Sequence, residues 1–370
     1  MDYNNTKKQP LYLQIYTSIL QQIQQGGYEV GTQLPTEKEI AQQYNVSRIT
    51  SKKALDMLEM DGIISRTPGR GSFVLRVPPA FEGQAGNSSG GSRLVGLVIE
   101  KLQSSFGVEL LMGIEKRCTE LGYTLVLKCT YGSKEAEEQY VRELYEHGVE
   151  GILILCVFDE IYNAQVLNLA YDNFPVVLID RRLQGIPLPY VGTDNEDAAR
   201  ALTDQLFADG DQHIGFITAD TAFSTSTIIL RYNGFVESCT KHGQVVEDYQ
   251  RFAGLLNHRT PEEWEEHFSI NVDRCMRYMK QHDDLTAFIV TSYDYAVIVE
   301  EAAYRMKKET GKSYSLATFD SPEAVPQYKR ITHIQQDQWS IGRIATDLLF
   351  KKKDGKEIPA VTHVPYRLIR

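Results

Sequence analysis

The 370-residue chain lacks several features that would each place it in a particular class of protein. It has only five cysteines and no C-x-x-C pair, which argues against a disulfide framework and against a clustered zinc site. No stretch approaches the roughly 20 apolar residues of a membrane span. The N-terminal residues contain no apolar segment of a secretory signal. We therefore expect a cytoplasmic protein with no membrane association.

Signatures of nucleotide cofactors and of metallohydrolases are also missing. The sequence has no G-x-G-x-x-G, no Walker A sequence and no H-E-x-x-H. Eight histidines and many carboxylates are compatible with acid–base catalysis, yet no motif organises them around a reacting group. We predict that the protein is not an enzyme and has no catalytic residues, no metal and no cofactor.

The negative charge of the chain is unevenly spread. The total is −10, but residues 1–76 hold nine Lys and Arg against seven Asp and Glu, which leaves −12 for the remainder. A strongly acidic surface disfavours nonspecific binding to a polyanion. Any contact with nucleic acid should therefore come from the N-terminal segment.

A segment rich in glycine, serine and proline divides the chain. Residues 78–92 hold four glycines, three serines and two prolines, a composition typical of a flexible linker. The length of the chain also exceeds what one hydrophobic core usually serves. We predict a small domain at 1–76, a linker at 77–92 and a larger domain at 93–370.

The larger segment predicts an α/β fold. Short apolar runs alternate with amphipathic helical patterns such as 108–121 and 135–147. Continuous apolar runs are typical of parallel strands that are covered on both faces. About 278 residues of this pattern predict two lobes of doubly wound parallel sheets, with a ligand crevice at the carboxyl ends of the strands. The runs are 94–100, 124–128, 151–157, 176–180, 214–218, 285–290 and 315–319.

The N-terminal segment predicts three helices followed by a hairpin. An apolar stripe indicates a helix over 11–25, and Thr36 and Ser47 can cap two further helices, of which the last runs to about residue 60. Two short helices joined by a tight turn form a helix-turn-helix, whose second helix enters the major groove of DNA. The hairpin after them predicts a wing with Arg70 at its tip.

The last of these helices carries groups suited to DNA. Arg48 and Lys52 are four residues apart and share a face, and a guanidinium matches the O6 and N7 acceptors of guanine. Lys52 suits a phosphate, and the hydroxyls of Ser47 and Thr50 can donate to a base or a phosphate. An isolated pair of cations is usually a solvated surface. Here the helix-turn-helix and the arginine hairpin favour a DNA interface.

This segment resembles the winged helix-turn-helix of the GntR family, through the stretch LPTEKEIAQQYNVSRITSKKALDMLEMDGIISRTPGRGSFV. The resemblance covers nearly all of residues 1–76 and implies contacts with double-stranded operator DNA. Many family members have arginine where Lys52 stands. The contacts that the resemblance implies are made by Glu37, Lys38, Arg48, Lys52, Arg70 and Gly71.

The predicted crevice has side chains that suit a sugar. Sugars offer hydroxyls and apolar ring faces, so their sites combine forked polar groups with aromatic rings. Glu100 and Lys101 follow the first strand, and Asp180 and Asp320 each follow a later one. An aspartate at a strand end is equally often a turn or helix-capping residue.

Residues 94–370 resemble the effector domain of LacI/GalR repressors, which has the periplasmic-binding-protein fold. Pieces such as PVVLIDRR, RYNGF, LATFDSP and THIQQDQWSIGRIATDLL follow the family order. In R-x-x-G-F, Arg231 takes the place of the effector-binding arginine of the family. Ser292 and Tyr293 stand where the family commonly has Asn-Asp, which suggests a changed effector. The predicted effector site comprises Glu100, Lys101, Phe106, Asp180, Arg231, Tyr293, Asp320 and Gln336.

Together these observations predict a transcriptional repressor of carbohydrate-utilisation genes that a small sugar releases from its operator. L-Arabinose or another pentose is the first choice of effector. A regulator that responds to a nucleoside or another small polar ligand, or a binding protein of the same fold, remains the alternative. A single helix-turn-helix buries little DNA surface, so we also predict a homodimer that forms through the larger domain.

Overall fold

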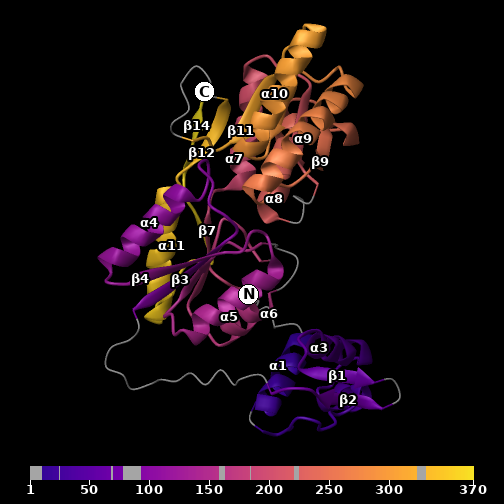
Figure 1. Cartoon of the computed structure of the whole chain (residues 1–370), viewed down its shortest axis with the longest axis vertical. Coiled ribbons are helices and arrows are strands. Elements are labelled where there is room, and N and C mark those ends of the chain that lie inside the picture. The colour runs from indigo at the N-terminus through magenta and orange to yellow at the C-terminus, as the bar shows by residue number, and fades with distance from the viewer. Residues whose placement is uncertain are drawn as a thin grey trace, which may run out of the picture. The chain divides into compact units, whose positions relative to one another are not determined.

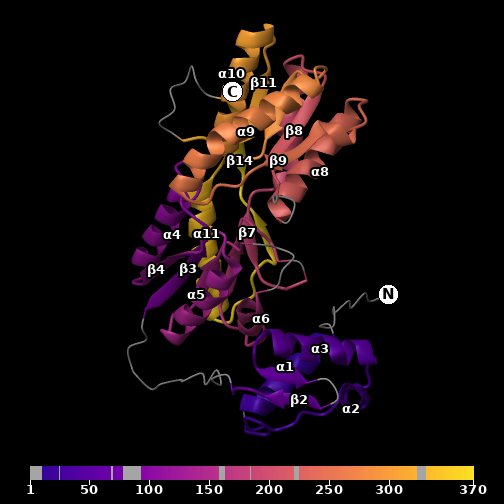
Figure 2. The same ribbon diagram turned by 45° about the vertical axis from the view of Figure 1, so that its right-hand side comes forward.

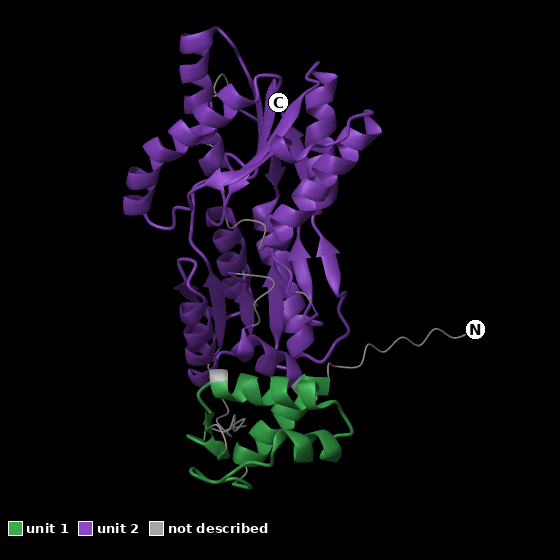
Figure 3. Cartoon of the chain, turned by 90° about the vertical axis from the view of Figure 1, so that its right-hand side faces the viewer, with its two compact units in different colours: residues 1–89 green, residues 90–370 purple. Residues whose placement is uncertain are grey.

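The computed structural model describes residues 11–24, 26–67, 70–77, 93–157, 163–183, 185–220, 225–322 and 331–370. The chain forms two compact units, residues 1–89 and 90–370, which are described separately (Figure 3). The predicted linker lies outside the described residues from position 78 onwards, so its bounds stay predictions. No helix in the described part combines the length and apolar character that a bilayer span requires.

The first unit is a winged helix-turn-helix. Ile15, Ile19 and Ile23 form the buried face of α1, and they pack with Leu55 and Leu58 of α3 in one apolar core. The two strands pair antiparallel and form the wing. The elements are α1 (Leu11–Gln24), α2 (Glu37–Gln43), α3 (Arg48–Met60), β1 (Ile64–Thr67) and β2 (Gly71–Val74).

The second unit has two lobes, which lie one above the other in Figures 1 and 2. The first lobe holds a six-stranded sheet of order β13-β7-β6-β5-β3-β4, in which all neighbouring strands are parallel. Its strands are β3 (Leu94–Ile99), β4 (Thr124–Cys129), β5 (Ile152–Ile154), β6 (Val176–Ile179), β7 (Tyr190–Gly192) and β13 (Val361–His363). Its helices are α4 (Val108–Glu120), α5 (Lys134–Glu146), α6 (Ala164–Tyr171) and α11 (Gln338–Lys353).

The second lobe repeats this architecture with a sheet of order β14-β12-β11-β10-β8-β9. Its strands are β8 (Ile214–Ala219), β9 (Arg251–Leu255), β10 (Ala287–Val290), β11 (Ser315–Phe319), β12 (Thr332–Gln336) and β14 (Tyr366–Ile369). Its helices are α7 (Asn195–Ala208), α8 (Ser226–Lys241), α9 (Pro261–Gln281) and α10 (Tyr293–Thr310).

Three connections in the described residues join the lobes, between β7 and α7, between β12 and α11, and between β13 and β14. Glycines allow close helix packing on either side of this hinge. A Cβ on Gly113 of α4 would lie 2.4 Å from the Trp339 carbonyl oxygen, and a Cβ on Gly234 of α8 would lie 2.1 Å from the Glu196 carbonyl oxygen. Any larger residue at either position would therefore separate the helix pair.

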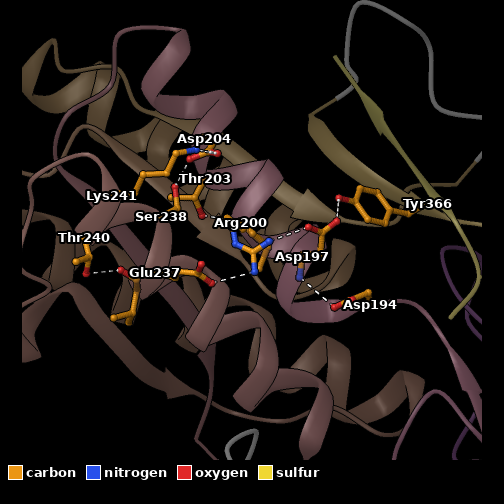
Figure 4. Close-up of polar contacts among 12 residues, drawn as sticks. Asp194, Asp197, Arg200, Thr203, Asp204, Glu237, Ser238, Thr240, Lys241 and Tyr366 are labelled. Carbon is orange, nitrogen blue, oxygen red and sulfur yellow. Dashed lines mark hydrogen bonds and ion pairs between the residues drawn. The ribbon is translucent and has the colours of Figure 1, made fainter. Parts of the chain in front are cut away.

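Polar contacts also tie α7 to its neighbours (Figure 4). Arg200 forms ion pairs with Asp197 and with Glu237 of α8, both at 2.9 Å or less. The Tyr366 hydroxyl of β14 donates to Asp197 at 2.7 Å. The hinge end of α7 is thereby held to β14, which begins at another hinge connection.

The structure confirms all seven predicted strands, although β5 is shorter than its apolar run. Five further strands were not predicted from the sequence: β7, β9, β12, β13 and β14. Of these, β7 and β13 have three residues each, and β12 (THIQQ) mixes polar and apolar residues. The predicted doubly wound parallel sheets are confirmed, with one departure among the described strands of the second unit: β14 pairs antiparallel with β12. The reason is that β12 ends at the hinge whereas β14 begins there.

Candidate functional site

The two helices of the helix-turn-helix begin at well-formed caps. Thr36 and Glu39 form a reciprocal capping box at α2, and hydrogen bonds from Thr36 lower the pKa of the Glu39 carboxyl. At α3 the Ser47 hydroxyl accepts from the Thr50 amide at 3.2 Å. The Ser51 hydroxyl donates to the Glu37 carbonyl at 2.7 Å and so joins α3 to the start of α2. The caps predicted at Thr36 and Ser47 are confirmed.

The predicted DNA contacts divide into two groups. Lys38, Arg48 and Lys52 have exposed side chains, so their charges are accessible. Glu37 instead forms an ion pair with Arg66 of β1, and Arg66 also contacts Asp56 of α3. Glu37 therefore has a structural partner between helix and wing.

The wing is braced by a side chain that precedes α2. The Gln33 side-chain amide donates to the Arg70 carbonyl at 2.9 Å, and the Arg70 side chain is exposed. Gly71 has φ of 111°, and a Cβ there would lie 2.5 Å from the Gln33 amide nitrogen. Only glycine suits this position, so the structure gives Gly71 a backbone role.

One candidate for DNA contact on α3 was not predicted from the sequence. Ile49, between Arg48 and Thr50, is 80% exposed. An exposed apolar side chain near the start of such a helix can contact the methyl group of thymine. The sequence could have indicated this contact, because Ile49 is an apolar residue outside the inward apolar stripe of the helix.

The second unit contains a cleft of about 210 Å³ at the carboxyl ends of its strands. The cleft is small compared with the roughly 300–1,000 Å³ typical of sites for drug-sized ligands. Residues of both lobes line it, and all eight residues of the predicted effector site are among them: Glu100, Lys101, Phe106, Asp180, Arg231, Tyr293, Asp320 and Gln336.

Arg231 of α8 lines the cleft and is buried. Its Nε donates to Asn195 Oδ1 and its Nη1 to the Thr291 carbonyl, both at 2.7 Å. The guanidinium carbon lies 3.8 Å from the centre of the Phe319 ring. Burial lowers the pKa of the guanidinium, and Asp180 opposes this effect. These contacts fix the plane of a cation that remains ionised.

Asp180 and Asp320 occupy equivalent places in the two lobes, directly after β6 and β11. Both have positive φ values, 62° and 60°, which aspartate tolerates better than most residues. Burial raises the pKa of Asp320 to about 7, although its carboxylate accepts from the Gln336 side-chain amide at 2.6 Å. Burial also raises the pKa of Asp180, against the attraction of Arg231.

Several buried polar atoms of the cleft have no hydrogen-bond partner within the described part of the chain. They are Asp180 Oδ1, Gln336 Oε1 and His258 Nδ1. A buried polar atom without a partner typically costs about 1–3 kcal/mol. A polar ligand in the cleft would remove this penalty.

The remaining predicted residues also line the cleft. Glu100 forms an ion pair with Arg181 at 2.9 Å. Burial acts to raise the pKa of the Glu100 carboxyl, but Arg181 and the neighbouring cations together outweigh this effect, so the pKa is lowered. Burial lowers the pKa of Lys101. Phe106 and Tyr293 are half-buried and present aromatic surface to the cleft.

A further polar cluster of the second lobe lines the cleft and was not predicted from the sequence. Asn257, His258 and Arg259 follow β9 and line the cleft together with Asp294 and Tyr295. The polar stretch NHRT at 257–260 was the only indication of this cluster in the sequence. Its position at the cleft could not be inferred, because the strand before it, β9, was not predicted. No group of three or more His, Cys, Asp or Glu suited to a metal ion occurs among the residues that the structure describes.

Comparisons with known proteins define the class. Residues 92–369 match the model of periplasmic binding proteins and the sugar-binding domain of the LacI family, and the chain belongs to this family. Residues 11–74 match the bacterial regulatory proteins of the gntR family. The protein therefore joins a GntR-type DNA-binding domain to a LacI-type sugar-binding domain.

Among individual relatives, the arabinose metabolism transcriptional repressor of Geobacillus stearothermophilus is 26% identical over 98% of this chain and 96% of its own length. The ribose operon repressor of Halalkalibacterium halodurans is 26% identical over 75% of this chain and 78% of its own. A LacI family transcriptional regulator from Mycobacterium smegmatis shares the fold, with a TM-score of 0.61 at 18% identity over 75% of this chain and 97% of that chain.

Proposed function

We propose that the protein is a transcriptional repressor of sugar-utilisation genes, that its cleft binds a neutral monosaccharide, and that binding releases operator DNA. The observation that carries the proposal is the buried Arg231 between Asp180 and Asp320, which have raised pKa values. This arrangement provides a fixed forked donor and acceptors for sugar hydroxyls.

The chemistry of the cleft suits a small neutral ligand. Hydroxyl groups of a sugar can donate to Asp180 Oδ1 and Gln336 Oε1 and accept from Arg231. Phe106 and Tyr293 offer ring faces for the apolar side of the sugar. Two relatives are named for arabinose metabolism and for the ribose operon, which supports a pentose, with L-arabinose as the first choice.

The DNA-binding part of the proposal assigns direct base contacts to Arg48 of α3 and backbone contacts to Lys38, Lys52 and Arg70. Their exposed side chains support this assignment. The relatives are named as transcription regulators, which supports a role without catalysis. A repressor binds the chromosome, so the proposed location in the cell is the cytoplasm.

We also propose a homodimer that forms through the second unit. Val108 and Met112 lie one turn apart on α4 and are exposed, as is Trp339 at the start of the adjacent α11. Met112 is 54% exposed, although methionine is usually among the buried residues. An exposed apolar patch of this kind supports an interface, and two paired DNA-binding domains suit a near-palindromic operator.

Isothermal calorimetry with L-arabinose, D-ribose, D-xylose and D-glucose tests the proposed effector class. We expect wild type to bind a pentose and Arg231→Ala to bind none. Arg305→Ala is the control, because it removes an arginine outside the cleft that pairs with Glu301 and whose side chain is 41% exposed. Gel shifts on upstream DNA should show that the same pentose releases the protein. Undiminished binding by Arg231→Ala would refute the site, and a nucleoside becomes the better candidate if no sugar binds wild type.

A further inference from the structure

Two side chains of the first lobe form hydrogen bonds with the second lobe across the cleft. The Lys101 ammonium donates to the His258 carbonyl at 2.7 Å, and the Gln103 side-chain amide donates to the Asp294 carboxylate. Lys101 and Gln103 lie between β3 and α4 in the first lobe, whereas His258 and Asp294 belong to the second. Neither contact is possible when the lobes are apart.

The first-lobe side of this contact is held in place by the hinge. The backbone amide of Gln103 donates to the Phe106 carbonyl at 2.9 Å and closes a tight loop. Gln338, the first residue of α11 after the chain leaves the second lobe, holds this loop at two points: its Oε1 accepts from Gly107 N and its Nε2 donates to the Ser105 carbonyl, both at 2.8 Å. The position of Gln103 is therefore coupled to the hinge.

The second-lobe side of the contact is also held in place by neighbouring residues. The His258 ring packs against Trp264 and Tyr295, with ring centres 4.6 and 5.0 Å apart, and its Nε2 lies 3.3 Å from Asp294 Oδ2. The Asp294 side chain is 21% exposed. The carboxylate is thus positioned before Gln103 reaches it, so little conformational entropy is lost when the contact forms.

We propose that Gln103 and Asp294 form a latch, which holds the two lobes closed over the effector and sets its affinity through closure. The inference rests on the proposed function, since it requires that the cleft binds a ligand. We assign both as positioning residues, because they contact each other from opposite lobes. When only the closed state is binding-competent, the apparent dissociation constant rises as the closed fraction falls.

The ligand-free chain provides the first test. Spin labels introduced as non-natural residues at exposed Tyr171 of the first lobe and exposed Val245 of the second report lobe separation, without use of the native cysteines. Gln103→Glu places two carboxylates together, and we expect a longer, broader distance distribution. Asp294→Asn added to Gln103→Glu restores a donor–acceptor pair and should return the wild-type distribution. The same distribution for wild type and Gln103→Glu would overturn the latch.

Effector binding provides the second readout, with L-arabinose as the first probe in calorimetry and stopped-flow. Gln103→Glu should weaken binding about tenfold, mostly through faster dissociation, and Asp294→Asn should reverse this loss in the double variant. A loss without reversal would contradict the latch and indicate direct contact with the effector. If wild type binds no sugar, the proposed function fails, while the spin-label distances still decide whether the latch exists.

Discussion

Removing the charge of Arg231 should destabilise the second unit in a way that depends on pH. Arg231→Met keeps an unbranched stem of similar length beside Phe319 but deletes the guanidinium that lies between Asp180 and Asp320. Removal of one partner from a buried ionic cluster typically costs about 3–5 kcal/mol of unfolding free energy. Part of this cost disappears when a remaining carboxylate takes up a proton.

The direction of the pH effect follows from the raised pKa values. The pKa of Asp320 is about 7 in the folded wild type, so the folded state holds a proton that the unfolded state has already lost. The contribution of protonated Asp320 to the free energy of unfolding is fully present below the unfolded-state pKa. This contribution is lost as pH rises to about 7. Without Arg231 the folded-state pKa values of Asp180 and Asp320 rise further. The variant should therefore lose stability more steeply than wild type above pH 7, by up to about 1.4 kcal/mol per pH unit for each carboxyl group that is still protonated.

Urea unfolding at pH 6, 7 and 8 followed by tryptophan fluorescence measures this directly. The two tryptophans, Trp264 and Trp339, both lie in the second unit, so the signal reports on that unit alone. Arg305→Met, which removes a partly exposed arginine outside the cleft, is the matched control and should show a small cost without pH dependence. A free-energy difference between wild type and Arg231→Met that is the same at all three pH values would refute the reasoning.

Three further predictions concern DNA, assembly and coupling. Arg48→Ala should cost about 1–3 kcal/mol of operator affinity and relax specificity at one base pair, whereas Arg70→Ala should weaken all sequences alike and lower the salt slope by about one. Competitive gel shifts at several salt concentrations measure both, and equal operator affinity for wild type and Arg48→Ala would contradict a base contact. Met112→Lys should convert the dimer to a monomer in light scattering at micromolar concentration, and a monomeric wild type would disprove the interface. Operator DNA should weaken pentose binding by the same factor, roughly 5- to 150-fold, by which the pentose weakens operator binding, and unequal factors in calorimetry would exclude simple two-state coupling.

Local patterns were sufficient to predict most of the secondary structure. The caps at Thr36 and Ser47 and the seven apolar strands depend on neighbouring residues, and the structure confirms them. The short strands β7 and β13 carry no such signal, because three residues cannot show a periodicity. Their existence depends on the strands beside them in the sheet.

The candidate cleft was predictable in part for the same reason. Asp180 and Asp320 follow strands that the sequence reveals, and parallel strands bring their carboxyl ends to one edge. His258 and Asp294 were out of reach, since the first follows the unpredicted β9 and the second contacts a residue 191 positions earlier, Gln103. Likewise, only the structure shows that Glu37 has Arg66 as a partner.

The sequence by itself determined the two domain types, the order of their elements and the chemical character of the predicted sites, because these depend on residue identity and short-range periodicity. The tertiary structure alone decided which side chains meet. Examples are the orientation of Arg231 between Asn195 and Thr291, the antiparallel β14 and the contact of Gln103 with Asp294. Those contacts join residues far apart in the chain, and their geometry is set by the packing of whole sheets and helices.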